Sequence, residues 1–233
     1  MGNNWLNIIQ DYLLPPTCIL CGHSGYNSQD ICPACFSDLE KNIYCCYRCA
    51  ENFETAISIP QLCGRCLSKS PAFDETFAPF IYQGIIRYLI ASLKFNKQYK
   101  NARLLGYLLA TYIEKTTEIP QLIIPVPLHK KRYQERGFNQ STEIAKTIAK
   151  RLNIPINTKI CSRIRNTPHQ IELPAKQRIL NVKNAFVVNN PIDIQHVAIL
   201  DDVITTGSTT NEIAKVLKKA GVARVDVWGC AKA

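Results

Sequence analysis

The stretch that decides the fold is residues 197–210, VAILDDVITTGSTT. It opens with four aliphatic residues in a row, which is typical of a parallel strand covered on both faces. The chain then leaves the strand at Asp201 and Asp202 and continues into a loop rich in hydroxyl groups. In open α/β sheets, ligands bind at this edge, beyond the carboxyl ends of the strands. We therefore expect an α/β fold with a binding site at residues 201–209.

The two ends of this loop suit different parts of a sugar phosphate. Ionised carboxylates only accept hydrogen bonds, so Asp201 and Asp202 suit the vicinal hydroxyl groups of a ribose. The backbone N–H groups of Thr206 to Thr209, at the start of a helix, suit a phosphate. The loop has neither the lysine of a P-loop nor a G-x-G-x-x-G turn, which favours a single 5′-monophosphate. The alternative is an acidic strand end followed by ordinary Thr and Ser helix caps.

The full pattern resembles the phosphoribosyl pyrophosphate (PRPP) motif of type I phosphoribosyltransferases. Residues 125–132 (PVPLHKKR) and 136–140 (RGFNQ) resemble the competence protein F family. Further residues fall at spacings similar to that family's: Arg163, Arg165, Thr167, Gln170, Leu173, Arg178, Asn181, Val182, Ala185 and Phe186. The likeness covers nearly the whole chain. It implies an α/β fold with a type I phosphoribosyltransferase-like parallel sheet flanked by helices, preceded by a small cysteine-rich zinc-binding domain.

The resemblance also implies roles for particular residues. Asp201 and Asp202 would bind the ribose hydroxyls and act as the catalytic pair, and Mg²⁺ would accompany PRPP. A strained or cis peptide after Pro127 would turn N–H groups toward the leaving pyrophosphate. Arginines, including those of residues 163–178, would close over the site. The remaining PRPP-binding residues implied in this way are Thr205, Thr206, Gly207, Ser208, Thr209, Leu128, His129, Lys130, Arg132 and Arg136.

In function, the resemblance implies a competence protein involved in natural transformation and DNA uptake. Its phosphoribosyltransferase-like domain would bind PRPP and single-stranded DNA beside a competence helicase. Two alternatives stay open: an active phosphoribosyltransferase that uses a nucleobase or another acceptor, and a PRPP-responsive regulator that binds without turnover. The sequence carries no signature of a base pocket, and a fold with a donor site does not establish catalysis.

Eleven cysteines indicate metal binding. Eight of these cysteines form four C-x-x-C pairs. Because two such pairs complete one Cys₄ zinc site, we expect two structural zinc ions. A disulfide framework would need an oxidising compartment, which nothing in the sequence indicates. We expect sequential pairing, but a cross-braced arrangement, or Cys45 in place of Cys46, stays open. Cys161 and Cys230 are expected in the core. The predicted ligands are Cys18, Cys21, Cys32 and Cys35 for the first ion, and Cys46, Cys49, Cys63 and Cys66 for the second.

The net charge of +10 is unevenly divided. Residues 1–78 carry 4 Lys and Arg against 8 Asp and Glu, or −4, whereas residues 79–233 carry 24 against 10, or +14. Two filled Cys₄ sites would make the first part more negative still. We therefore expect the α/β part to meet a polyanion. Its excess charge leaves room for single-stranded nucleic acid, with bases stacking on aromatic side chains drawn from Tyr88, Phe95, Tyr99, Tyr133 and Phe138.

We divide the chain into residues 1–72, an N-terminal helix and a double zinc ribbon, and residues 73–233, the phosphoribosyltransferase-like domain. The N-terminal helix is expected from an apolar stripe of Trp5, Leu6, Ile9 and Leu13. With no secretory signal and no apolar run long enough to span a membrane, we expect a cytoplasmic protein that reaches the inner face of the membrane only through partners.

Periodicity predicts the elements of the second part. Residues 122–160 are expected to form a parallel βαβ unit, and residues 186–188 a short strand or hairpin. The other predicted strands are residues 77–82 and 224–230, and the predicted helices are residues 84–95, 104–113, 144–152 and 213–220.

Overall fold

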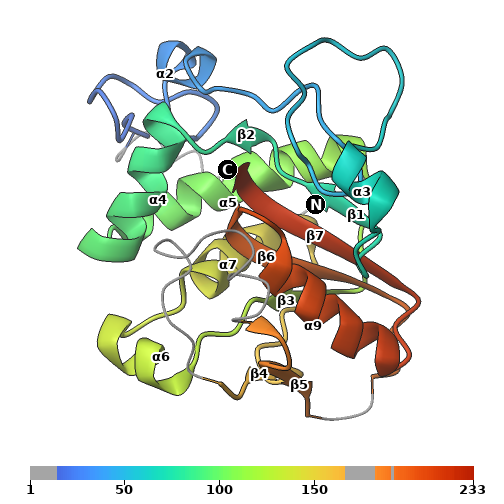
Figure 1. Cartoon of the computed structure of the whole chain (residues 1–233). Coiled ribbons are helices and arrows are strands. Elements are labelled where there is room, and N and C mark those ends of the chain that lie inside the picture. Colours follow the sequence, from blue (N-terminus) through green and yellow to red (C-terminus); the bar gives the residue numbers. More distant parts are fainter. Residues whose placement is uncertain (1–14, 166–181, 190–191) are drawn as a thin grey trace.

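A parallel β-sheet lies at the centre of the larger part of the chain (Figure 1). The computed structural model describes residues 15–165, 182–189 and 192–233. The sheet has the spatial order β1-β7-β6-β3, β2 also pairs with β7, and every pairing is parallel. Its carboxyl ends therefore lie at one edge. The strands are β1 (Glu75–Phe77), β2 (Phe80–Ile81), β3 (Leu122–Pro125), β6 (His196–Ile204) and β7 (Arg224–Lys232).

Helices cover both faces of this sheet (Figure 1). Side chains of β6 alternate between two apolar layers, because successive residues of a strand point to opposite faces. Ala198 and Leu200 pack in the layer of α4 (Gly84–Asn96), α5 (Tyr99–Thr116) and α7 (Gln140–Leu152). Val197 and Ile199 pack in the layer of α9 (Ser208–Lys219). The central strand is thus buried on both faces, as its aliphatic run predicts.

Glycine allows α5 and α7 to approach closely. A Cβ atom on Gly106 of α5 would lie 2.7 Å from the carbonyl oxygen of Ile144 and 2.8 Å from Cβ of Thr147. Both of those atoms belong to α7, so a larger residue at position 106 would push the two helices apart.

The four helices predicted in the second part of the chain are confirmed, but two strand predictions are wrong in part. Residues 77–82 form no single strand, because β1 and β2 flank Pro79 and pair separately with β7. Residues 154–160 contribute only one parallel bridge to the sheet, between Ile123 and Ile156. The Asn157 side chain then accepts the N–H groups of Lys159 and Ile160 at 2.8 and 3.0 Å, which turns the chain.

The chain instead forms a separate hairpin after this turn. Strand β4 (Cys161–Arg163) pairs antiparallel with β5 (Phe186–Val188), as the hairpin alternative at residues 186–188 predicts. The predicted N-terminal helix falls within residues 1–14 and lies outside the described residues. So do Thr167, Gln170, Leu173, Arg178 and Asn181. Within the described part of the chain, no helix combines the length and hydrophobicity that a membrane span requires.

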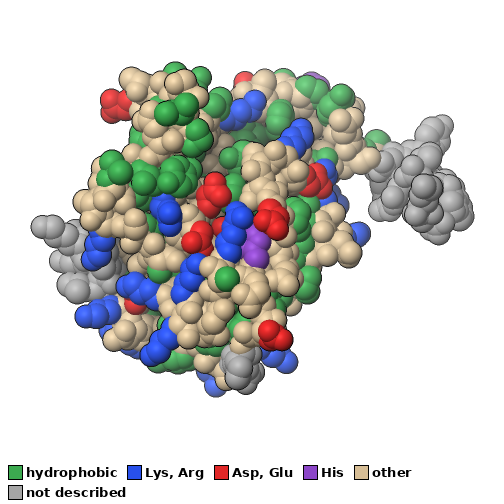
Figure 2. All heavy atoms as spheres, turned by 90° about the vertical axis from the view of Figure 1, so that its right-hand side faces the viewer, with side chains coloured by type: hydrophobic (Ala, Val, Ile, Leu, Met, Phe, Trp, Pro, Cys, Tyr) green, Lys and Arg blue, Asp and Glu red, His purple; other side chains and the backbone are tan. Residues whose placement is uncertain are grey.

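Charged side chains at the amino ends of β6 and β7 neutralise one another. Asp226 is fully buried, accepts from His196 Nε2 at 2.8 Å and accepts from Arg224 Nε at 3.1 Å. Arg224 also reaches Glu75 and Glu118, each at 3.5 Å. Figure 2 shows acidic and basic side chains gathered around a histidine in the middle of this face. This edge of the sheet is held by internal ion pairs and lies away from the predicted site.

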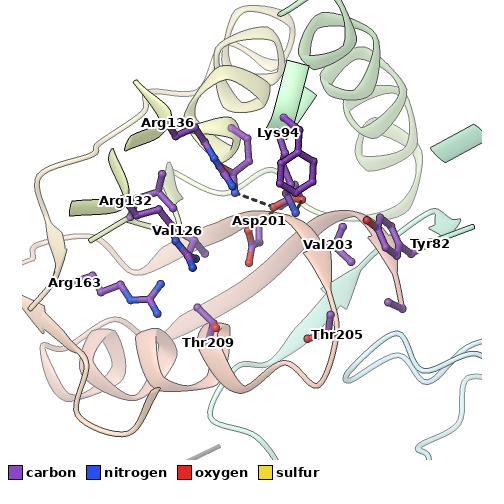
Figure 3. Close-up of a pocket in the computed structure, with 15 residues that line it drawn as sticks. Tyr82, Lys94, Val126, Arg132, Arg136, Arg163, Asp201, Val203, Thr205 and Thr209 are labelled. Atoms are coloured by element: carbon purple, nitrogen blue, oxygen red, sulfur yellow. Dashed lines mark hydrogen bonds and ion pairs between the residues drawn. The ribbon is translucent and has the colours of Figure 1, made fainter. Parts of the chain in front are cut away.

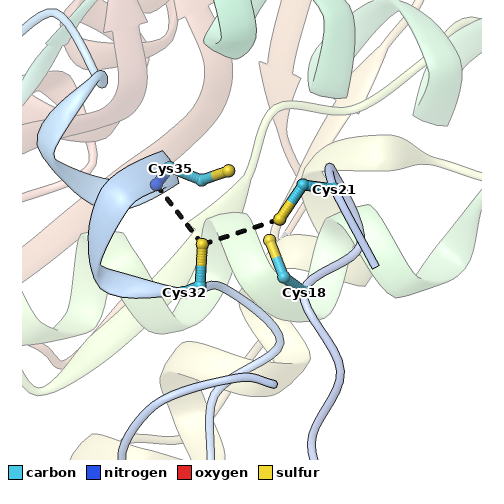
Figure 4. A group of neighbouring side chains, drawn as sticks. All are labelled: Cys18, Cys21, Cys32 and Cys35. Atoms are coloured by element: carbon cyan, nitrogen blue, oxygen red, sulfur yellow. Dashed lines mark hydrogen bonds between the residues drawn. The ribbon is translucent and has the colours of Figure 1, made fainter. Parts of the chain in front are cut away.

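Eight cysteines form two Cys₄ clusters in the N-terminal part, which also contains α2 (Pro33–Ser37) and α3 (Gly64–Ser68). The sulfur atoms of Cys18, Cys21, Cys32 and Cys35 lie within 4.8 Å of one another (Figure 4), and so do those of Cys46, Cys49, Cys63 and Cys66. In each cluster one pair of sulfurs, Cys21–Cys32 and Cys49–Cys63, is 3.6 Å apart. A tetrahedral zinc ion with bonds of about 2.3 Å needs sulfurs about 3.8 Å apart.

The clusters therefore fit two structural zinc ions, with sequential pairing. The cross-braced alternative is wrong, and Cys45 belongs to neither cluster. Cys45 instead forms an isolated bridge with Asn52. Cys161 and Cys230 are buried in the core, as predicted.

The zinc-binding part is attached to the edge of the sheet by main-chain contacts. The Ile81 N–H group donates to the Glu40 carbonyl at 2.9 Å, and the Thr76 N–H group donates to the Tyr47 carbonyl at 3.1 Å. The buried Asn42 amide donates to the carbonyls of Ala50 and Ala78 at 2.9 and 3.2 Å. The zinc sites thus stabilise the segment that covers β1 and β2.

Neighbouring cysteines give a matched test of the ligand set. Cys46→Ser should reduce the zinc content from two ions per chain to one and lower the melting temperature, because metal binding contributes about 10–16 kcal/mol to the folding of small zinc modules. Cys45→Ser should keep both ions. Elemental analysis of protein purified under reducing conditions measures this, and loss of zinc from Cys45→Ser alone would reverse the assignment.

Candidate functional site

A cavity of about 310 Å³ lies at the carboxyl ends of β3, β6 and β7 (Figure 3). Residues after β3 form one wall, and the end of β6 and the start of α9 form another. Side chains from α4, α6 (Lys130–Arg136), α7 and β4 complete it. The lining residues are Tyr82, Lys94, Phe95, Val126, Leu128, Arg132, Arg136, Gln140, Arg163, Asp201, Asp202, Val203, Thr205, Thr209 and Ala233.

Many of the predicted site residues meet in this cavity. Those that line it are Asp201, Asp202, Thr205, Thr209, Leu128, Arg132 and Arg136. Gly207 and Ser208 line a smaller adjoining hollow of about 20 Å³, together with Thr205 and Thr209. Thr206, His129 and Lys130 line neither space. The structure therefore brings the acid pair, the hydroxyl-rich loop and the arginines together, and leaves two residues of the predicted pyrophosphate loop outside.

The two acids have different partners. Asp202 is buried, forms an ion pair with Lys94 of α4, and accepts from Gln140 Nε2 at 3.1 Å. Asp201 accepts from Ser141 Oγ at 3.2 Å and from the Asp202 N–H group at 2.9 Å. The first residues of α7 therefore orient both carboxylates, and Lys94 holds only the second.

Because of these contacts, the pKa values of the two carboxyl groups shift in opposite directions. Burial, and then the neighbouring Asp202 charge, raises the pKa of Asp201 to about 7. Burial alone would also raise the pKa of Asp202, but the Lys94 ammonium and the Gln140 hydrogen bond outweigh it and lower that pKa. For Lys94, the Asp202 carboxylate likewise outweighs burial and raises the pKa. Near neutral pH, Asp202 is therefore ionised, and Asp201 gains or loses a proton easily.

Hydroxyl groups in the loop after β6 make hydrogen bonds at the start of α9. Gly207 has a φ of 72°, a left-handed conformation that favours glycine, and it precedes the first residue of α9. The hydroxyl oxygens of Thr206 and Ser208 lie 2.6 Å apart, and Thr206 Oγ1 accepts the Ser208 N–H group at 3.3 Å. Thr206 thus forms a turn just before α9, and the helix cap itself is Gly207, which makes no side-chain cap hydrogen bond. Thr205 and Thr209 still line the main cavity, where the first turn of α9 offers its positive end.

Three guanidinium groups face the acid pair across the cavity. Figure 3 shows Arg132, Arg136 and Arg163 directed into the space in front of Asp201. Burial, with repulsion from Arg132, lowers the pKa of Arg163 to about 10. Burial also lowers the pKa of Arg136, and Arg132 adds to the effect while Asp202 opposes it. Cations that disfavour one another in a partly desolvated space are stabilised by a bound anion.

The segment after Pro127 differs from the expected loop. No peptide bond between described residues is cis, and His129 has an ordinary extended backbone with a φ of −66°. His129 caps a short helix, because its Nδ1 atom accepts the Lys131 N–H group at 3.3 Å, and α6 begins at Lys130. The charged side chains of this helix, rather than an unusual peptide, therefore reach the cavity.

Sequence reasoning missed several residues of the cavity. Lys94 belongs to no motif and had no predicted role, while Gln140 ends the RGFNQ stretch without an assigned role. Tyr82 also lines the cavity without a predicted role, and Phe95, expected only as a stacking residue, lines it too. Helical spacing offered one signal, because Ile90 and Leu93 are buried and place Lys94 beside the core face of α4.

A larger cavity of about 580 Å³ lies between the first zinc cluster and α5. Its lining is mainly apolar, and the charged residues that line it are Lys41 and Lys115. It lacks the carboxylates that would recognise a sugar, so the smaller cavity is the candidate site.

The protonation of Asp201 predicts a pH effect on stability. The folded-state pKa of Asp201 is raised above the unfolded value of about 3.9. The protonated Asp201 carboxyl group therefore contributes stability that is fully present below about pH 3.9 and is lost as the pH rises through about 7. From about pH 6 to pH 8, the free energy of unfolding of Asp201→Asn should therefore rise relative to that of the unmodified protein. Chemical denaturation at fixed zinc and salt measures this difference, and a constant difference would contradict the assignment.

Asp202→Asn provides the contrast. It leaves the Lys94 ammonium buried without its partner, so it should lower the free energy of unfolding by about 3–5 kcal/mol across the same pH range.

A comparison with known families agrees with the zinc-binding part of the chain. The double zinc ribbon domain family matches residues 9–67. Among solved structures, glutamine PRPP amidotransferase from Bacillus subtilis, complexed with ADP and GMP, overlaps 55% of this chain and 26% of that chain at 21% identity. The TM-score is 0.38, so this overlap adds nothing to the topology described above.

Two curated relatives match over almost their full length. The DNA utilization protein YhgH of Escherichia coli (strain K12) is 34% identical over 226 residues, covering 92% of this chain and 96% of that protein. Competence protein F of Haemophilus influenzae is 36% identical over 225 residues, covering 93% of this chain and 96% of that protein. On the strength of this shared length and identity, the chain belongs to the competence protein F family.

Proposed function

We propose that the cavity at the carboxyl ends of the strands binds PRPP, and that the chain uses this site in the uptake or utilization of DNA. The DNA role is supported by the names of its relatives, competence protein F and DNA utilization protein YhgH. The PRPP role is supported by one observation above all. A carboxylate pair, a hydroxyl-rich helix start and three guanidinium groups line the same cavity.

Each part of the ligand has matching chemistry in the cavity. The ribose hydroxyls would donate to Asp201, since Asp202 is held by Lys94 and Gln140. The 5′-phosphate would lie at the start of α9 beside Thr205 and Thr209. The pyrophosphate would pair with Arg132, Arg136 and Arg163.

The donor set also fits a magnesium ion. Mg²⁺ prefers oxygen ligands and keeps several waters, and Asp201 offers carboxylate oxygens that Lys94 does not neutralise. When bound with PRPP, Mg²⁺ would reduce the negative charge of the pyrophosphate. Asp201 would orient the ribose, and its carboxylate would stabilise positive charge that develops at the glycosidic carbon if transfer occurs.

Whether the site only binds PRPP or also catalyses transfer of the phosphoribosyl group depends on the presence of an acceptor. The ionisable side chains that line the cavity are Tyr82, Lys94, the two acids and the arginines. Lys94 is paired with Asp202, and we assign Asp201 and the arginines to the donor. This composition supports binding of PRPP without naming a nucleophile. Transfer to a nucleobase and regulation by PRPP are the two alternatives for the step after binding.

Single-stranded DNA is the second proposed ligand of the same domain. Exposed aromatic side chains of α4, α5 and α6 support it: Phe95, Tyr88, Tyr133 and Tyr99 are 66%, 59%, 52% and 49% exposed. Phe138 was wrongly included among the stacking residues, because it is 4% exposed and packs against Tyr99.

Asp201→Asn should weaken the binding of PRPP in the presence of Mg²⁺ by about tenfold to a hundredfold, because a hydrogen bond to a charged group contributes about 1.5–3 kcal/mol. Titration calorimetry of the full chain measures this. Asp38→Asn, an exposed change at the end of α2, is the matched control and should bind as the unmodified protein does. Equal affinity in Asp201→Asn and Asp38→Asn would remove the site assignment.

Incubation with PRPP, Mg²⁺ and a panel of nucleobases separates the alternatives. Release of pyrophosphate with one base, and its loss in Asp201→Asn, would establish a transferase. Tight binding of PRPP with no release would favour the regulator or the DNA-uptake factor.

A further inference from the structure

The cavity opens onto a surface built from the end of α4, the start of α5 and α6. We call it the α4–α6 surface; it comprises Phe95, Lys97, Lys100, Arg132, Tyr133 and Arg136. Figure 1 shows the end of α4 and helix α6 at the same side of the molecule. Two contacts join these elements: the rings of Tyr99 and Phe138 have centroids 5.0 Å apart, and Lys97 Nζ lies 4.0 Å from the position that a Cβ atom on Gly137 would take.

This surface has the chemistry that single-stranded DNA requires. Unpaired bases stack on aromatic faces, and the Phe95 and Tyr133 side chains are 66% and 52% exposed. Lys97 and Lys100 are exposed beside them and can neutralise backbone phosphates. In residues 94–100 and 130–138 the only acidic residue is Glu135. The charge of the surface is therefore complementary to a polyanion.

Part of this surface is also part of the cavity. Phe95, Arg132 and Arg136 line the 310 Å³ space in front of the acid pair. Building on the proposed function, we infer that PRPP and single-stranded DNA exclude one another, because both ligands need Arg132 and Arg136, and Phe95, on which a base would stack, lines the same cavity.

Electrostatics makes the exclusion strong. A guanidinium group that forms a bidentate pair with pyrophosphate has its directed N–H groups engaged and is not available to a DNA phosphate. Bound pyrophosphate also places negative charge at the mouth of the cavity, where it repels the DNA backbone. The amount of PRPP would thus set how much of the protein is available to hold DNA.

Competition can be measured with a fluorescent oligothymidylate of about 20 nucleotides. Its dissociation constant is determined by anisotropy at constant ionic strength, with Mg²⁺, and with PRPP at about ten times the PRPP dissociation constant found by calorimetry. Competition at one site predicts that the apparent dissociation constant for DNA rises about tenfold. Sodium sulfate at the same ionic strength is the control anion and should leave it unchanged.

Four variants separate the shared residues from the others. Lys100→Gln should weaken DNA binding and leave PRPP binding unchanged, because Lys100 lies outside the cavity. Asp201→Asn should keep the DNA affinity and require more PRPP for displacement. Arg132→Gln should weaken both, whereas Lys131→Gln on the same helix should leave PRPP binding unchanged.

The outcomes distinguish the two proposals. If PRPP binds and the DNA affinity stays the same or improves, the exclusion is overturned and the proposed PRPP site stands. If PRPP binds and the oligonucleotide does not, the DNA surface is overturned alone. If calorimetry detects no PRPP binding by the unmodified protein, the proposed function fails and the exclusion fails with it.

Discussion

The ion pair between Lys94 and Asp202 connects the fold to the site. It joins α4 to the end of the central strand, and its side chains are 16% and 4% exposed. Neither charge could be buried there alone without a large desolvation cost. The pair fixes one acid as a structural anion, and it leaves Asp201 as the carboxylate whose proton and hydrogen bonds can change when a ligand binds. Two adjacent aspartates thereby acquire different roles through their neighbours.

Charged side chains are balanced in different ways at the amino ends of β6 and β7, in the second zinc ribbon and in the cavity. At the amino ends of β6 and β7, Arg224 forms an ion pair with the buried Asp226, and His196 contacts the same carboxylate. In the second zinc ribbon, Arg65 lies 3.6 Å from the Cys49 sulfur and 3.3 Å from Glu51, so a cation stands beside thiolates. In the 310 Å³ cavity, basic side chains outnumber acidic ones around the carboxylate pair, with Lys94 and three arginines against two aspartates among the lining residues. A bound anion completes this balance.

The parts of the fold that depend on local pattern could be predicted from the sequence. The aliphatic run before Asp201 predicted the central strand, and the C-x-x-C spacings predicted both zinc clusters, because each pattern determines its own geometry. Lys94 could not be assigned, since its contact with Asp202 joins residues far apart in the chain. The strand expected at residues 154–160 does not form because the Asn157 turn outweighs an apolar stretch. Helix α6 was missed because, apart from Tyr133, its residues are polar or charged and carry no apolar periodicity.

Amide hydrogen exchange with and without PRPP and Mg²⁺ tests the central claim most directly, because it reports each segment of the full chain under native conditions. The account predicts slower exchange at Thr205 to Thr210 and in α6 when the ligand is bound, and a much smaller effect in Asp201→Asn. Unchanged exchange in both segments at a ligand concentration that saturates binding, with protection confined to another part of the chain, would contradict it.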